Sequence, residues 1–294
     1  MLKTTLERKA IEISERLKAY IPNIKGYDEI IYEAMSYSYF AGGKRLRPLL
    51  MLTASQLFNC DEEEVYPFAA ALEMIHTYSL IHDDLPAMDN DDYRRGKLTN
   101  HKVYGEDMAI LAGDGLLNLA YETMSLACMK TEKREQIKAM HVIAESAGTR
   151  GMIGGQVVDI LSEGKIISID QLTYIHEKKT SKLIQAALVA GAVLAGASEK
   201  DICNMEEFGL KLGLAFQIQD DILDVTSTME QLGKPIGSDE KNQKKTYVTM
   251  VGLEPAMEKV HSLTMEAIAC LDGYPAERVQ FLKDLAYYLI YRTN

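Results

Sequence analysis

Two groups of aspartates are the residues best suited to chemistry in this sequence. The first follows the apolar run YSLI and reads DDLPAMDNDD, which places five carboxylates between Asp83 and Asp92. Carboxylates this close together raise one another's pKa and destabilise the fold unless something neutralises them. Water, the following Arg94 and Arg95, or a bound metal ion would each serve.

The second group ends the apolar segment FGLKLGLAFQIQDDILD with Asp220, Asp221 and Asp224. Asp220 and Asp224 are four residues apart, so a helix would place both on one face, about 6 Å apart along its axis. The apolar flanks predict a mostly buried helix, where unpaired carboxylates are costly.

Each aspartate group alone is equally well explained as a solvated helix end. Together they predict one shared site for magnesium, which binds oxygen ligands and bridges carboxylates to phosphate. The candidate ligands in the first group are Asp83, Asp84 and Asp89.

A ligand that carries phosphate would also need cations, and the sequence offers several. Gly42 and Gly43 free the backbone ahead of Lys44, Arg45 and Arg47, a grouping suited to an anion. A glycine-terminated helix followed by solvated cations explains these residues equally well. Arg94 and Arg95 would alternatively form salt bridges with the neighbouring aspartates. Lys178, Lys179 and Thr180 are expected to open a long apolar helix near its positive dipole end. Further cations are Lys234, Lys244 and Lys245.

Two histidines precede the first aspartate group in the segment ALEMIHTYSLIHDD. His76 lies seven residues before Asp83 and hence nearly on the same helical face, whereas His82 is interpreted as a core residue. The sequence contains no discernible Ser-His-Asp or Cys-His arrangement, and no GxxxxGK[ST] or GxGxxG where a nucleotide site would need it. Nucleotide chemistry is therefore disfavoured.

The elements that must carry these groups are helices. Apolar residues recur three and four positions apart in nearly every segment, as at Leu6, Ala10, Ile13 and Leu17, whereas strand-like alternation is scarce. Glycines and prolines separate the segments and predict about ten helices with short links. Without a long linker or an internal repeat, one all-α domain over residues 1–294 is expected. Residues 227–246 are rich in Lys, Asp, Gly and Gln and are interpreted as a candidate lid.

Composition narrows the class of protein. Of the 294 residues, 47% are hydrophobic and 26% are charged, as in an ordinary soluble globular protein. The net charge of −11 argues against nucleic acid or an anionic membrane as the main partner, because both need a basic field.

The charged start MLKTTLERK lacks the apolar core of a signal peptide. The apolar stretch at residues 183–197 is too short for a membrane-spanning helix. We expect a cytoplasmic protein without membrane insertion, with four separate reduced cysteines.

The motifs GGKRLRP, HTYSLIHDDLPAMDNDDYRRG, KT in EKKTSKL and FQIQDDILD, in this order, resemble those of the trans-isoprenyl diphosphate synthases. More narrowly, the motifs resemble those of the bacterial farnesyl diphosphate synthases. The resemblance spans about residues 42–245. One small departure is Asn90, where relatives often continue the aspartate run, but it lies outside the expected ligand positions.

The resemblance implies a single all-α helical bundle around a central cavity, usually in a homodimer. It also implies a prenyltransferase reaction. An allylic diphosphate, dimethylallyl or geranyl, loses its diphosphate to magnesium, and the double bond of isopentenyl diphosphate attacks the resulting carbocation. The implied cofactor is Mg²⁺, three ions per active site, held by Asp83, Asp84, Asp89, Asp220, Asp221 and Asp224.

The resemblance further assigns the other site residues. Lys179, Thr180 and Gln217 are the expected catalytic residues, the last two facing the developing cation with their oxygens. Arg94, Lys179 and Lys234 are expected to hold the allylic diphosphate, with Lys244 joining the closure over it. The isopentenyl diphosphate pocket is expected at Lys44, Arg47, His76 and Arg95.

The length of the product is expected to depend on the residues just before Asp83. Ser79 and Tyr78, four and five positions earlier, lie about one helical turn back, where the growing chain must run. A tyrosine ring there predicts a stop at fifteen carbons, farnesyl diphosphate, with geranylgeranyl diphosphate as the alternative product. A terpene cyclase would not need the second anion pocket. A non-catalytic helical partner would be expected to lack one of the two aspartate groups.

Overall fold

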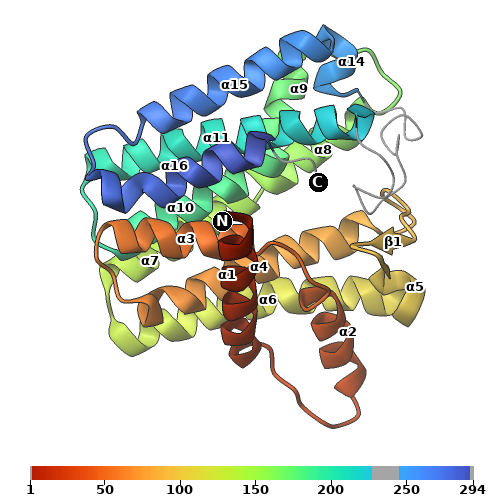
Figure 1. The fold of residues 1–294 in the computed structure, drawn as a ribbon. Coiled ribbons are helices and arrows are strands. Elements are labelled where there is room, and N and C mark those ends of the chain that lie inside the picture. The colour runs from red at the N-terminus through yellow and green to blue at the C-terminus, as the bar shows by residue number, and fades with distance from the viewer. Residues whose placement is uncertain (1, 227–244, 292–294) are drawn as a thin grey trace.

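The computed structural model describes residues 2–226 and 245–291, and nearly all of its regular structure is helical. Figure 1 shows the helices arranged as a bundle, with one short hairpin of two strands. The helices of the first half are α1 (Leu2–Leu17), α2 (Glu29–Tyr39), α3 (Leu46–Leu57), α4 (Glu62–Asp83), α5 (Asn100–Tyr104), α6 (Glu106–Thr131) and α7 (Arg134–Ala147). The strands are β1 (Tyr93–Arg94) and β2 (Lys97–Leu98), and η1 (Lys18–Tyr20) is a 3₁₀ turn. The second half contains α8 (Met152–Ser162), α9 (Ile169–Ile175), the π-helical turn η2 (His176–Ser181), α10 (Lys182–Leu194), α11 (Glu199–Thr226), α14 (Tyr247–Val251), α15 (Leu253–Ala269) and α16 (Ala276–Tyr291). This confirms the expected all-α class.

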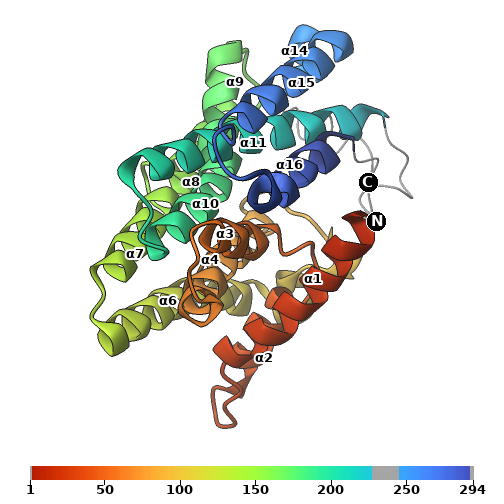
Figure 2. The ribbon, with the colours of Figure 1, turned by 60° about the vertical axis from the view of Figure 1, so that its left-hand side comes forward.

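The core is built around α10, which was expected to be a buried helix and is one. Every residue from Leu183 to Leu194 is buried, because α10 lies between α3 and α11 and also contacts α7 (Figure 2). A helix that is apolar on all sides needs neighbours on all sides, and the surrounding helices supply them. Among the described residues, no helix is long and apolar enough to cross a membrane.

The two helices that carry the aspartate groups end on the same side of the molecule. Helix α4 packs along α6, α11 packs along α10 and α15, and the C-terminal ends of α4 and α11 both lie at the right of Figure 1. Asp83 is the last residue of α4, and Asp220, Asp221 and Asp224 lie in the last two turns of α11. The topology therefore brings both acidic ends to one face of the bundle.

One expectation about helix ends is wrong. Residues Lys178–Thr180 do not open the long apolar helix, because α9, η2 and α10 run on without a break from Ile169. The true start is capped by Ser168, whose hydroxyl accepts from the Gln171 N–H. No helix breaker stands between Ser168 and Lys182. The irregularity is instead a π turn, a feature that often marks functional sites.

The candidate lid at residues 227–246 lies outside the described residues, except for Lys245 and Thr246.

Candidate active site

The first aspartate group closes α4 and folds back on itself. The backbone N–H of Asp89 donates to the carbonyl of Asp83 at 2.9 Å, so the loop after Pro86 returns Asp89 to the helix end. Asp84 is only 3% exposed. Its carboxylate accepts from Nε of Arg94 at 2.7 and 2.9 Å, so Arg94 forms the salt bridge that the sequence left open.

The electrostatics of Asp84 indicate a site suited to a cation. Burial raises the pKa of Asp84 to about 6, and the hydrogen bonds and charge of Arg94 offset only part of this effect. The charges of Asp91 and Asp83 make smaller contributions to this raised value. A cation added beside Asp84 would favour its charged form and offset the cost of burying it.

The second aspartate group ends α11 and is held by backbone and side-chain donors. Asp221 is 4% exposed, and its Oδ2 accepts from the backbone N–H of Tyr247 at 2.7 Å. Tyr247 is the first residue of α14, so its N–H has no acceptor within the helix and is suited to negative charge. Nε2 of Gln217 donates to the other oxygen of Asp221 at 3.2 Å. Asp220 and Asp224 are half-buried beside it.

A series of side-chain contacts through α8 and η2 links the two groups. Nε2 of Gln156 in α8 donates to Oδ1 of Asp83 at 2.8 Å. One turn along α8, Asp159 accepts from Nζ of Lys179 at 2.7 Å. The close fit of these elements depends on Gly155, because a Cβ there would lie 2.4 Å from the backbone N of Lys179.

The π turn continues this series to α11. Thr180, next to Lys179, donates its hydroxyl to Oε1 of Gln217 at 2.8 Å, and Gln217 in turn holds Asp221. Of the three predicted catalytic residues, the structure thus joins Thr180 to Gln217, whereas the side chain of Lys179 pairs with Asp159. His176 also lies in the π turn, with Nε2 3.7 Å from Asp221, and burial lowers the pKa of His176 to about 4.

A cluster of cations lies beside the first group. Burial and the charges of Arg47, Arg95, Arg94 and Arg45 lower the pKa of His76 well below its usual range. The imidazole is therefore neutral at physiological pH and surrounded by guanidinium groups. Of the residues predicted for a second anion pocket, Arg47 and Arg95 thus act electrostatically on a third, His76.

Within this cluster, Arg47 and Arg95 repel each other. Burial is the main cause that lowers the pKa of Arg47 to about 10, with a smaller lowering from Arg95 opposed by Glu73. Nε of Arg47 is buried and has no hydrogen-bond partner among the described residues. Arg95 donates to the carbonyl of Gly42 at 2.5 Å. Two like charges and an unpaired donor make a site that an anion would stabilise.

Arg45 has a different role from Lys44 and Arg47, a difference that residue type alone does not reveal. It is 3% exposed and adopts a left-handed backbone with φ of 48°. Its guanidinium donates to Glu73 at 2.8 Å, to the carbonyl of Tyr39 at 2.7 Å and to Ser14 at 2.9 Å. Each of the three guanidinium nitrogens therefore has an acceptor, so Arg45 fixes the conformation of the GGKRLRP loop. Lys44, next to it, is exposed to solvent.

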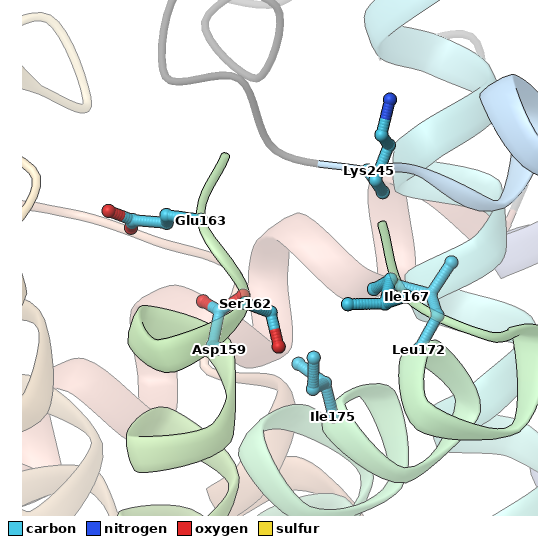
Figure 3. Close-up of a pocket in the computed structure, with 7 residues that line it drawn as sticks. All are labelled: Asp159, Ser162, Glu163, Ile167, Leu172, Ile175 and Lys245. Carbon is cyan, nitrogen blue, oxygen red and sulfur yellow. The ribbon is translucent and has the colours of Figure 1, made fainter. Parts of the chain in front are cut away.

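Several predicted residues lie elsewhere or outside the described part of the chain. Lys234 and Lys244 are outside the described residues. Lys245 is described and lines a small pocket with Asp159, Glu163 and Ser162 (Figure 3). In Figure 3 the acidic side chains lie on one side of this pocket and the apolar Ile167, Leu172 and Ile175 on the other.

The two residues predicted to control chain length lie in α4 before Asp83. Tyr78 is 6% exposed, and its hydroxyl is buried without a hydrogen-bond partner among the described residues. Burial, with smaller contributions from Tyr121 and Asp83, raises the pKa of Tyr78 to about 12, so the ring is neutral. Ser79 donates its hydroxyl to the carbonyl of His76 at 2.9 Å.

The aspartates supply the right atoms for magnesium. Among the described residues, no three His, Cys, Asp or Glu side chains are arranged to hold a metal ion, and Asp84 is paired with Arg94. The donors nevertheless fit the ion, because both groups offer only carboxylate oxygens and one member of each, Asp84 and Asp221, is buried. A cation would neutralise charge that the fold otherwise holds at a cost.

Gln156 and Asp159 were not predicted as site residues, because no single residue type in the segment GGQVVD indicates a catalytic or binding site. The signal was the spacing: two polar side chains three residues apart on a short helix that otherwise offers only small and apolar residues.

Comparisons with known proteins identify the family. The polyprenyl synthetase family model matches residues 28–280. A geranylgeranyl diphosphate synthase of Cyanophora paradoxa is 48% identical over 262 residues, which cover 89% of this chain and 86% of the relative. A farnesyl diphosphate synthase of Geobacillus stearothermophilus is 46% identical over 255 residues, or 86% of this chain and 85% of the relative.

Solved structures give the same result. A FPP/GFPP synthase from Zymomonas mobilis has a TM-score of 0.87 and 34% identity, with 98% of both chains covered. A geranyltransferase from Helicobacter pylori, complexed with magnesium and isoprenyl diphosphate, has a TM-score of 0.86 and 33% identity, with 97% and 96% covered. The chain belongs to the polyprenyl synthetase family and is a prenyltransferase of the trans-isoprenyl diphosphate synthase type.

Proposed function

We propose that this enzyme condenses isopentenyl diphosphate with dimethylallyl and then geranyl diphosphate and releases farnesyl diphosphate. The observation that carries the choice of product is the buried ring of Tyr78, one turn before the aspartates that end α4. A chain that extends from the diphosphate back along α4 meets this ring, and a close-packed interior does not absorb the overlap. Growth therefore stops at fifteen carbons.

The diphosphate end is held by magnesium and cations. Asp83, Asp84 and Asp89 would hold the ions on one side, and Asp220, Asp221 and Asp224 on the other. Bound Mg²⁺ supplies positive charge that stabilises a departing diphosphate. Arg94 and Lys179 bind the allylic diphosphate, and in doing so exchange their present partners Asp84 and Asp159 for phosphate oxygens. The resemblance adds Lys234 and Lys244 to this set.

The carbocation is stabilised by oxygens of the π turn and α11. Because Thr180 donates its hydrogen to Gln217, the lone pairs of the Thr180 oxygen stay available to a positive charge. The amide oxygen of Gln217 adds a second negative dipole. These groups act at the reacting carbon without taking up a proton.

Isopentenyl diphosphate occupies the cation cluster of Lys44, Arg47, His76 and Arg95. The unpaired Nε of Arg47 and the repulsion between Arg47 and Arg95 are both relieved by an anionic diphosphate. Neutral His76 donates one N–H hydrogen bond. This second anion pocket favours a condensing enzyme over a terpene cyclase, which uses one diphosphate.

The active form is proposed to be a homodimer. Helix α6 exposes Ile110 and Leu111, and α8 exposes Val157 and Leu161, each between 44% and 60% accessible. Large apolar side chains grouped on a helix face mark an interaction surface. A second copy of this chain is the proposed occupant. The mass in solution tests this, and Leu111→Asp should shift the protein toward the monomer.

A product assay tests the proposed function. The enzyme is incubated with dimethylallyl and isopentenyl diphosphates and Mg²⁺, and the products are identified by mass. Farnesyl diphosphate as the main product supports the proposal. Geranylgeranyl diphosphate is the second candidate, because relatives of both names are equally similar, and it would contradict the proposed limit at Tyr78. Product formed without isopentenyl diphosphate would indicate a cyclase.

A further inference from the structure

The ring of Tyr78 is not held by a hydrogen bond of its own. Its hydroxyl is buried without a partner among the described residues, so packing alone determines where the ring lies. One turn along α4, the ring of His82 meets it edge to face, with centroids 5.7 Å apart and planes at 79°. Such aromatic pairs are directional and stabilise one ring orientation over others.

His82, by contrast, is anchored to the neighbouring helix α6. Its Nε2 lies 3.1 Å from the carbonyl oxygen of Ile110, so an Nε2–H would donate to that carbonyl. Asp114 of α6 lies further away, with Oδ1 3.9 Å from Nε2. The ring therefore has one defined attachment point on α6, directly beside α4.

Gly113 makes this attachment possible. A Cβ at position 113 would lie 2.1 Å from Nε2, 2.5 Å from Cδ2 and 2.8 Å from Cε1 of His82. Real atoms do not approach so closely, so any other residue at position 113 would push the imidazole off α6. The glycine, His82 and Tyr78 thus form a stack that runs from the backbone of α6 to the ring at the proposed chain limit.

We propose that His82, seated against Gly113, is a positioning residue that holds the Tyr78 ring across the path of the growing chain and so sets the product length. This inference rests on the proposed function, in which Tyr78 is the limit. His82 touches no reacting atom. It acts through Tyr78, because without the edge-to-face contact the tyrosine ring is free to turn and open the path.

The competing role for His82 is to support its neighbour Asp83. A residue that only supported Asp83 would change the rate and leave the ratio of products unchanged. A residue that acts through Tyr78 changes the ratio. The ratio of twenty-carbon to fifteen-carbon product is therefore the decisive measurement, and it is independent of total turnover.

The test compares His82→Ala, Gly113→Ala, Tyr78→Ala and the double variant of His82 and Tyr78 in the product assay. We expect His82→Ala to raise the ratio by about fivefold, the factor for a typical edge-to-face contact. Gly113→Ala should raise it in the same direction, and helix propensity favours alanine, so folding is not at risk from the backbone. Tyr78→Ala should raise the ratio most, and the double variant should match Tyr78→Ala.

Gly115→Ala is the matched control. It makes the same change on the same helix, but its Cβ would meet the flexible Met35 thioether at 3.0 Å instead of His82. The control should keep the wild-type ratio. If Tyr78→Ala shifts the ratio while His82→Ala and Gly113→Ala do not, the positioning role is refuted and the proposed function stands. If Tyr78→Ala also leaves the product unchanged, the chain limit itself is wrong.

Discussion

Gln156 of α8 lies 2.8 Å from the carboxylate of Asp83, and this contact ties the first aspartate group to the helix that also carries Asp159. Asp159 in turn holds Lys179 of the π turn, and its neighbour Thr180 reaches Gln217. Two acidic helix ends that are about 140 residues apart along the chain are thereby linked through α8. The orientation of Asp83 depends on a residue that carries no charge.

Gln156→Ala should therefore slow catalysis without unfolding the protein. Partners that orient a metal ligand are typically worth about 10- to 100-fold in activity, and we expect a loss of kcat in that range at saturating Mg²⁺ and substrates. Steady-state kinetics with a thermal melt measures it. Gln171→Ala is the control, because that side chain donates to Ser162 and reaches neither aspartate group. Equal kcat in the two variants would rule out the orienting role.

The aspartates should differ sharply in importance. Asp84→Asn and Asp220→Asn keep the shape of the side chain but remove its charge. We expect each to lose more than about 100-fold in Mg²⁺-dependent turnover, because even the partners of metal ligands cost that much. Asp91→Asn should cost far less, since Asp91 lies 3.8 Å from Arg94 at the edge of the group. A magnesium titration of activity separates the three variants, and near wild-type turnover in Asp84→Asn would refute the shared metal site.

The two substrate pockets should respond to different variants. Arg47→Gln removes a buried cation from the isopentenyl diphosphate pocket and should raise the KM for that substrate by at least about tenfold, the factor for one charge-assisted hydrogen bond. Lys179→Gln should instead reduce kcat and raise the KM for the allylic substrate. Varying one substrate at a time at saturation of the other measures this. The same defect in both variants would contradict two separate pockets.

Spacing and residue type were enough to predict that both aspartate groups stand at the ends of apolar helices and that the helix at Leu183–Leu194 is buried. They did not separate Arg45 from Arg47, because the left-handed backbone of Arg45 and the position of Glu73 arise only in the folded chain. The start at Ile169 of the continuous helix that leads into α10 was also not predicted, because Lys178–Thr180 were interpreted as its start. Threonine is typical of helix starts, but without a breaker the backbone continues through Thr180 as a π turn.

His76 should make the protein sensitive to acid. The folded-state pKa lies well below its usual value of about 6.5 because of burial and four arginines, whereas the unfolded chain protonates near that value. The unfolded state thus binds more protons as the pH falls, so the contribution of neutral His76 to the free energy of unfolding is fully present above about pH 6.5. This contribution is lost progressively below that pH, by about 1.4 kcal/mol per pH unit. In His76→Gln the part of the loss that is due to His76 is absent. Between pH 7.5 and 5.5, the Tm of the variant should fall by about 2–4 °C less than that of the wild type.

His141→Gln is the control, because the ring of His141 is exposed and hydrated in both states. Its removal should leave the wild-type dependence of Tm on pH unchanged. Parallel slopes for the wild type and His76→Gln would show that the imidazole is not buried among the arginines.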